Sequence, residues 1–429
     1  TTGPRPIRTA RSGVIGLIGT APDAGGAAAA TLTIGVPAAN NALTFTAATP
    51  GVAGNGISVT IVDPDTADAS LAVDVTGNAI TVTLATDNTG AITSTADDVA
   101  IAIDGDVSAS ALVTVADAGS SDGTGVMRSR PRSLFSGGAD EPFPLNTPVL
   151  VAGSRTQAAA LGTTGTLPSA IDGIFDQAGA VVVVVRVDAG VDDTATTANI
   201  VGGVDGVTGA REGVQAFLDA EGRVGVKPRI LCAPGWTHQR SGTANAVVAE
   251  MVGIAERLEA VLIADGPNTT DTAAITYRGD WGSDRVFVVD PFVLVSRDGV
   301  VVQEPASARV AGLIARVDDE VGFWESPSNK QLRGIVGTAR NIDASAGDRN
   351  SRATILNENE VTTIKRGDGF VLWGNRTTSP DPKWAFLSVR RTADIINDSL
   401  REAHQWAVDR SITRTFVEDV TESVNRFLR

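Results

Sequence analysis

The stretch Val181-Val182-Val183-Val184-Val185 decides the fold class of this chain. A strand that is apolar at every position is buried on both faces, as in a sheet that lies between two layers of helices. Similar short apolar runs occur at 230–233, 260–264 and 286–289, and helical patterns occur at about 168–177, 210–220, 243–257 and 306–318. Because strands and helices alternate, we predict an α/β core with helices around a mixed sheet.

Further periodic segments follow this core. A hairpin is predicted from 292–296 and 300–303, because Arg297-Asp298-Gly299 between them favours a tight turn. Two amphipathic helices are predicted at 392–408 and 415–428. The chain is therefore expected to combine α/β and α+β parts in several domains.

A sharp change in composition marks residues 24–140 as an inserted domain. Between Arg11 and Arg128 there is no Lys, Arg or Glu, yet this stretch contains 12 Asp. Apolar and Thr residues alternate, which is typical of a half-exposed antiparallel sheet, at 43–46, 57–62, 71–75, 80–84 and 112–115. One helix is predicted at about 96–103, with Ser94 or Thr95 as its N-cap. We expect a β-rich domain with one helix.

The composition excludes several classes of function. The chain has 429 residues, a formal net charge of −15, one Cys and two His. One cysteine rules out a disulfide framework and any Cys-cluster metal site. The acidic balance argues against direct nucleic-acid binding, and no apolar run approaches the ~20 residues of a membrane span. We predict no metal, no cofactor and no membrane partner.

Candidate catalytic residues are few. His238 follows an apolar run at a position where α/β enzymes place catalytic groups, so an α/β hydrolase-like enzyme is one alternative. The single Gly-x-Ser-x-Gly pattern, at 119–123, lies in a polar turn with no helical pattern after it, which is the wrong context for a nucleophile. His404 lies within a helical pattern beside Trp406. We therefore predict no catalytic residue.

One cluster has two interpretations. Arg376, Arg390 and Arg391 occur near Trp373 and Trp384 in the sequence. The cluster is either ion-paired packing at the edge of the core or a surface for a protein partner, since Arg and Trp are frequent anchors of interfaces.

Several motifs outside the inserted stretch resemble the sheath proteins of contractile tails in bacteriophages and related particles. The most specific is Gly369 to Arg376, which contains Leu372-Trp373-Gly374-Asn375-Arg376 and is followed by Trp384 and Val389-Arg390-Arg391. Other matching segments are 5–7, 13–22, 142–151, 166–175, 208–213, 227–231, 305–312 and 318–324. The resemblance covers about 1–23 and 140–429, and it does not include the block 24–140.

The resemblance implies a structural role. A sheath subunit polymerises with other copies around a tail tube and repacks into a shorter, wider helix, which drives the tube through the envelope of the target cell. It implies contacts with the tail tube protein, the baseplate and a tail terminator, a place in the virion tail, and assembly in the cytoplasm of the host bacterium. A static virion tail component is the other alternative.

The resemblance also implies a division of the chain. Residues 1–23 would be the first segment of the sheath core, 24–140 an outward-facing insertion, 141–329 the α/β core and 330–429 a domain that faces the tube. Extended arms that link subunits by strand addition would be mostly absent from both ends, so the chain as given is expected to be a monomer. Candidate contacts with the tube or other subunits are Arg376, Arg390, Arg391, Glu418, Asp419, Glu422 and Arg426.

Overall fold

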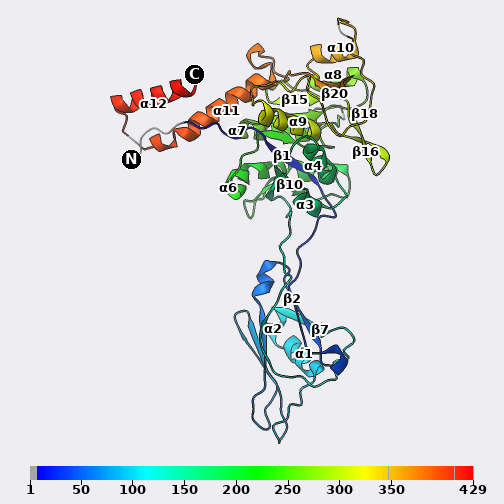
Figure 1. Ribbon diagram of the computed structural model, residues 1–429, viewed down its shortest axis with the longest axis vertical. Coiled ribbons are helices and arrows are strands. Elements are labelled where there is room, and N and C mark those ends of the chain that lie inside the picture. Colours follow the sequence, from blue (N-terminus) through cyan, green and yellow to red (C-terminus); the bar gives the residue numbers. More distant parts are fainter. Residues whose placement is uncertain (1–6, 241, 346, 410, 429) are drawn as a thin grey trace. The chain divides into compact units, whose positions relative to one another are not determined.

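The computed structural model describes residues 7–240, 242–345, 347–409 and 411–428 (Figure 1). Contacts divide the chain into two compact units. Unit 1 consists of Thr1–Ala24 and Phe143–Arg429, and unit 2 consists of Gly25–Pro142. Residues 330–429 belong to the same compact unit as the residues expected to form the α/β core.

The centre of unit 1 is a six-stranded mixed sheet with the order β15-β14-β13-β1-β10-β9. Five strands are parallel: β1 (Val14–Thr20), β10 (Val181–Val187), β13 (Ile230–Cys232), β14 (Val261–Asp265) and β15 (Val286–Val289). The edge strand β9 (Pro148–Ala152) runs antiparallel to β10. The expected mixed α/β class is confirmed, but the sequence analysis assigned no strand to 14–20, which forms the middle of the sheet.

The valine stretch supplies both faces of this sheet. Val182 and Val184 lie in one apolar core, and Val183 and Val185 lie in a second core on the opposite face. Helices α4 (Leu167–Phe175) and α9 (Ser307–Glu320) cover the first face, and α7 (Ala246–Leu258) covers the second. These four valines are fully buried, because successive side chains of a strand point to opposite faces and both faces are covered.

Two predicted helices have different bounds. The pattern at 210–220 forms a 3-10 helix, Gly213–Asp219, followed by the short α6 (Ala220–Val224). Gly209 and Gly213 have φ of +71° and +58°, a left-handed conformation that an α-helix cannot contain. The helix predicted at 392–408 is α11 (Leu387–Ala403). It begins earlier because Leu387 is fully buried, and the chain after it becomes extended at Val408.

The remaining elements of unit 1 surround the sheet. The predicted hairpin is β16 (Val293–Arg297) and β17 (Val300–Glu304), with β18 (Gly337–Thr338) on the other side of β16. A second hairpin consists of β19 (Thr363–Gly367) and β20 (Gly369–Trp373). The other elements are α3 (Arg155–Ala158), α5 (Asp193–Val201), β11 (Gly203–Val204), β12 (Arg211–Glu212), α8 (Asp271–Gly279), α10 (Arg352–Glu358) and α12 (Arg414–Phe427).

Unit 2 contains two small sheets and two α-helices, where the sequence analysis expected one helix. One sheet has the order β2-β3-β7 and the other β5-β6-β4-β8. The elements are β2 (Thr31–Ile34), β3 (Leu43–Ala47), β4 (Ser58–Val62), β5 (Ala72–Thr76), β6 (Ala79–Thr83), α1 (Ala96–Gly105), α2 (Val107–Ser110), β7 (Val113–Asp117) and β8 (Arg130–Leu134). An antiparallel sheet was expected, but the four-stranded sheet is mixed because β4 and β6 pair in parallel.

Local sequence explains the main helix of unit 2. Thr95 is its N-cap: the Thr95 hydroxyl accepts a hydrogen bond from the Asp98 N–H, and the Asp98 carboxylate accepts one from the Thr95 N–H. The acidic charge of this unit is partly offset at one edge, since Arg130 and Arg132 lie on β8 and Arg128 just precedes it.

The chain leaves unit 1 and returns to it beside a single arginine. The Arg186 side chain donates hydrogen bonds to the carbonyl oxygens of Phe143, at 2.7 Å, and Ala21, at 3.3 Å. Asp23 accepts four hydrogen bonds from the N–H and hydroxyl groups of Thr163 and Thr164. Both ends of the insertion are therefore fixed by contacts within unit 1.

Candidate assembly site: helices α11 and α12

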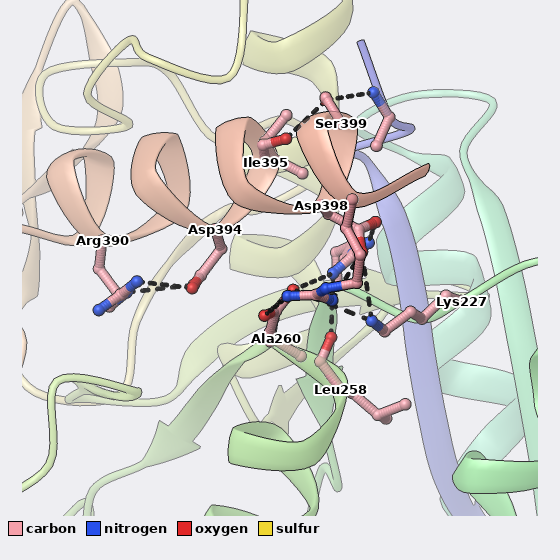
Figure 2. Close-up of polar contacts among 12 residues, drawn as sticks. Lys227, Leu258, Ala260, Arg390, Asp394, Ile395, Asp398 and Ser399 are labelled. Carbon is pink, nitrogen blue, oxygen red and sulfur yellow. Dashed lines mark hydrogen bonds and ion pairs between the residues drawn. The ribbon is translucent and has the colours of Figure 1, made fainter. Parts of the chain in front are cut away.

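Helix α11 lies across the amino ends of neighbouring parallel strands (Figure 2). Arg229 immediately precedes β13, Ala260 precedes β14 and Arg285 precedes β15. Both arginines also fix the chain that enters β14, because Arg229 donates to the Leu258 carbonyl and Arg285 to the Ala260 carbonyl, each at 3.0 Å. The helix presents two carboxylates one turn apart, Asp394 and Asp398, to these arginines.

Asp394 is the more deeply buried of the two carboxylates. Arg285 binds it through both terminal nitrogens, at 2.8 and 3.1 Å, and Arg390 binds it at 2.7 and 3.2 Å. Arg390 also reaches Asp284 at 3.1 Å. Burial disfavours the charged form of Arg285, but the hydrogen bonds and charge of Asp394 outweigh this effect and raise the pKa of Arg285.

Asp398 belongs to a more exposed group of charges. It accepts a hydrogen bond from Arg229 and lies 3.6 Å from the Lys227 ammonium and 3.3 Å from Arg401. Glu259, which just precedes β14, pairs with Arg401 at 2.5 Å. Burial, and then the neighbouring charge of Arg229, lower the pKa of Lys227.

A third set of contacts joins α11 to the chain that enters β1. Arg391 forms a bidentate ion pair with Asp318 of α9, at 2.8 and 2.5 Å, and donates to the Ser12 carbonyl at 3.3 Å. The Ser399 hydroxyl accepts a hydrogen bond from the Ala10 N–H at 2.9 Å. These contacts connect residues that lie about as far apart in the sequence as the chain allows.

The structure buries two of the predicted arginines inside unit 1. Arg390 and Arg391 are buried, and their guanidinium groups are engaged by carboxylates of the same chain. Arg390 also stacks over Trp384, at 4.1 Å from the ring centroid. Arg376 is half-buried and lies 5.2 Å from the ring centroid of Phe386. Ion-paired packing therefore describes Arg390 and Arg391 within this chain.

The predicted residues of α12 are more accessible. Glu418, Glu422 and Arg426 are exposed, and Asp419 is half-buried. Glu422 pairs with Arg426 at 2.8 Å along the helix, and Glu418 pairs with Arg414 at 2.8 Å. The exposed side of the helix forms a shallow groove lined by Val417, Glu418, Thr421, Glu422, Asn425 and Arg426. This face can offer both charges to a polar partner.

The rejected catalytic candidates have structural surroundings. The half-buried His238 ring packs edge-on against Phe292, with 5.2 Å between ring centroids, and burial lowers its pKa. The His404 ring contacts the Leu400 carbonyl at 2.6 Å, and Cys232 is fully buried. Within the described residues, no three His, Cys, Asp or Glu side chains are grouped so that they could hold a metal ion. No described helix is both long and apolar enough to cross a bilayer.

Asp265 is among the buried carboxylates that sequence reasoning missed. Asp265, at the end of β14, is fully buried and accepts hydrogen bonds from the Ser307 N–H at 2.8 Å and from hydroxyls of Ser307 and Thr237. It caps the start of α9 in place of a local N-cap side chain, which α9 lacks. Burial raises the pKa of Asp265 to about 6, although these hydrogen bonds act in the opposite direction. The sequence signal that could have identified this residue is an Asp at the end of an apolar run.

Comparison with known proteins identifies the class of this fold. Family models for the phage tail sheath protein central domain, the domain III N-terminal region of tail sheath protein Gp18 and the phage tail sheath C-terminal domain match residues 183–378, 129–187 and 379–429. The sheath complex of an extracellular contractile injection system in the contracted state has a similar fold, with a TM-score of 0.50 and 16% identity over 67% of this chain and 72% of that chain. The anti-feeding prophage baseplate in the contracted state matches with a TM-score of 0.52 and 17% identity, over 67% of this chain and 75% of that chain.

Curated relatives are closer in sequence. A putative prophage major tail sheath protein of Pseudomonas aeruginosa is 45% identical over 69% of this chain and 76% of that protein. The tail sheath protein of Escherichia phage P2 is 35% identical over 67% of this chain and 74% of that protein. The chain therefore belongs to the phage tail sheath family. It is a structural subunit of a contractile sheath and a component of a virion tail, as the sequence predicted.

Proposed function

We propose that copies of this chain polymerise around a tail tube in an extended state and repack on triggering into a shorter, wider lattice that drives the tube through a target envelope. The 45% identity to a prophage major tail sheath protein is the observation that carries this proposal. Subunits would hold one another through extended terminal arms, and a contact between repeated copies that does not close on itself generates the required helix.

The same proposal includes a baseplate and a terminator at the two ends of the polymer, and assembly in the cytoplasm of the host bacterium. Structures with this fold were determined in a baseplate and in a contracted sheath complex, which supports the baseplate as a partner. Residues 330–429 would face the tube and unit 2 would face outward. No step of this process uses catalysis, because the stored energy is a difference between two sets of contacts among subunits.

Electron microscopy of the protein with its natural ends tests the proposal directly. Hollow, striated cylinders are expected, and tube protein should be found inside them. If the particles showed no striated repeat, or if each tail contained only one copy of the chain, the chain would instead be a static part of the tail.

The exposed face of α12 is the proposed contact with the tube. Glu418, Glu422 and Arg426 line the exposed groove of α12, and Asp419 lies beside Glu418 in the sequence, so a contact through these charges could be released during contraction. Arg376 is the remaining accessible candidate among the predicted arginines. Arg390 and Arg391 support this region from inside unit 1.

Charge reversal separates a contact role from a structural one. Glu418→Lys with Glu422→Lys should weaken tube binding in co-sedimentation and should leave the circular dichroism spectrum unchanged, because exposed pairs along a helix contribute little to folding. Glu256→Lys is the matched control, since Glu256 is an exposed acid on α7 of the same unit. Equal tube binding by the double variant and the control would place the contact elsewhere.

A further inference from the structure

The segment that enters β1 runs along helix α11, although the two are at opposite ends of the sequence (Figures 1 and 2). Ser399 is fully buried and its hydroxyl is fully used: it accepts from the Ala10 N–H at 2.9 Å and donates to the Ile395 carbonyl at 2.6 Å. A backbone group of the entering segment is therefore held by a side chain whose own orientation is fixed by α11.

A second contact lies two turns earlier on the same helix. Arg391 donates to the Ser12 carbonyl, and its bidentate pair with Asp318 holds the guanidinium plane in place. The Arg391 and Asp318 side chains are only 5% and 2% exposed, so water competes little with this arrangement. The entering segment is consequently fastened at both Ala10 and Ser12.

The helix that holds this segment is itself anchored. Asp394 and Asp398 of α11 bind Arg285 and Arg229 at the amino ends of β15 and β13. The segment before β1 and helix α11 thus meet at one place, and this place is connected by ion pairs to the amino ends of two strands of the sheet.

We propose that Ser399 and Arg391 are positioning residues that fasten segment 7–12 to α11, so that the entry of the chain and α11 move as one body. A displacement applied at the entering segment then passes directly to α11 without stretching the six-stranded sheet. Its use in a polymer rests on the proposed function, because only neighbours that hold each other through extended terminal arms would apply such a displacement.

Distance measurements between two spin labels test whether the entering segment is fastened to α11. Labels at Arg8→Cys and Glu402→Cys occupy exposed positions on the segment and on the helix, and the native Cys232 is fully buried and does not react. Pulsed electron paramagnetic resonance should give one narrow distance distribution for the labelled parent. Ser399→Ala combined with Arg391→Lys should broaden it, because lysine keeps the charge for Asp318 but replaces the bidentate guanidinium by a flexible ammonium, which holds the Ser12 carbonyl less firmly.

Ser388→Ala is the matched control. Ser388 lies on the same helix and its hydroxyl accepts a hydrogen bond from Asn375 at 3.0 Å, but it does not contact the entering segment. The distribution should stay narrow in this variant. A broad distribution in the parent, or a narrow one in the Ser399/Arg391 variant, would overturn the proposal.

Hydrogen exchange provides a second readout that needs no spin labels. The Ala10 amide should be protected, and Ser399→Ala should reduce its protection roughly tenfold, the value expected for one lost hydrogen bond. If this amide exchanged in the native protein as fast as in an unfolded peptide, the proposal would also be overturned. Neither measurement requires polymers, so failure of the chain to form a sheath would leave both results interpretable.

Discussion

Replacement of Asp394 by alanine should destabilise unit 1 far more than the loss of an ordinary i,i+4 ion pair on a helix would. The Asp394 side chain is 4% exposed and accepts four hydrogen bonds from two arginines. In Asp394→Ala, Arg285, whose side chain is 10% exposed, loses the one carboxylate that pairs with it among the described residues, and within the same residues Arg390 keeps only Asp284. Removal of one partner from a buried ion pair costs about 3–5 kcal/mol, because an uncompensated charge remains in a poorly solvated place.

The chain contains a matched control for this variant. Arg414 and Glu418 have the same spacing and order as Arg390 and Asp394, but their side chains are 90% and 61% exposed. Exposed pairs of this kind contribute about 0.3–0.5 kcal/mol. Glu418→Ala should therefore leave the free energy of unfolding almost unchanged, although the sequence spacing is identical.

Urea unfolding followed by tryptophan fluorescence is the appropriate assay. All six tryptophans lie in unit 1, at 236, 281, 324, 373, 384 and 406, so unfolding of unit 2 does not contribute to the signal. A loss below about 1 kcal/mol in Asp394→Ala, similar to the loss in Glu418→Ala, would refute the reasoning. It would mean that water reaches Arg285 and Arg390 when the carboxylate is removed.

Two further outcomes are expected from the same assay. Because burial raises the pKa of Asp265 from 3.8 to about 6 in the folded chain, its contribution to stability is fully present below pH 3.8 and is lost as the pH rises through 6. The free energy of unfolding of the native chain minus that of Asp265→Asn should therefore fall by roughly 2 kcal/mol between pH 4 and pH 7, and a constant difference would contradict the buried state of this carboxylate. Replacement of residues 25–142 by a short Gly/Ser linker should keep the cooperative tryptophan transition, since Asp23 and Arg186 hold both ends of the insertion from within unit 1; loss of that transition together with insolubility would show that unit 1 depends on unit 2.

The regular parts of the fold could be predicted where local sequence dominates. The run at 181–185 is both β-branched and apolar, which leaves few alternatives to a strand buried on both faces. The central strand Val14–Thr20 was missed because Gly16 and Gly19 interrupt its apolar pattern. Both glycines are required by packing: a Cβ at Gly16 would lie 2.7 Å from Leu231, and one at Gly19 would lie 2.3 Å from the Thr166 hydroxyl.

The polar network under α11 could not be predicted from the sequence. The Arg390–Asp394 spacing is visible in the sequence, but it is identical to the spacing of Arg414 and Glu418 on the exposed α12. The partners that make the first pair buried come from positions more than a hundred residues away, such as Arg285. Burial of a charge depends on the tertiary fold, so spacing alone could not separate a core pair from a surface pair.

The carboxylates of α11 fix the position of this helix along its axis. A helix held by an apolar stripe alone can shift along its axis at modest cost, because one aliphatic contact replaces another. Here Asp394 and Asp398 each have their own arginine, Arg285 and Arg229, at the starts of different strands. A slip by one turn, about 5.4 Å, would leave a buried arginine unpaired. A subunit that must withstand sudden axial force can therefore keep this helix in one position without a larger apolar interface.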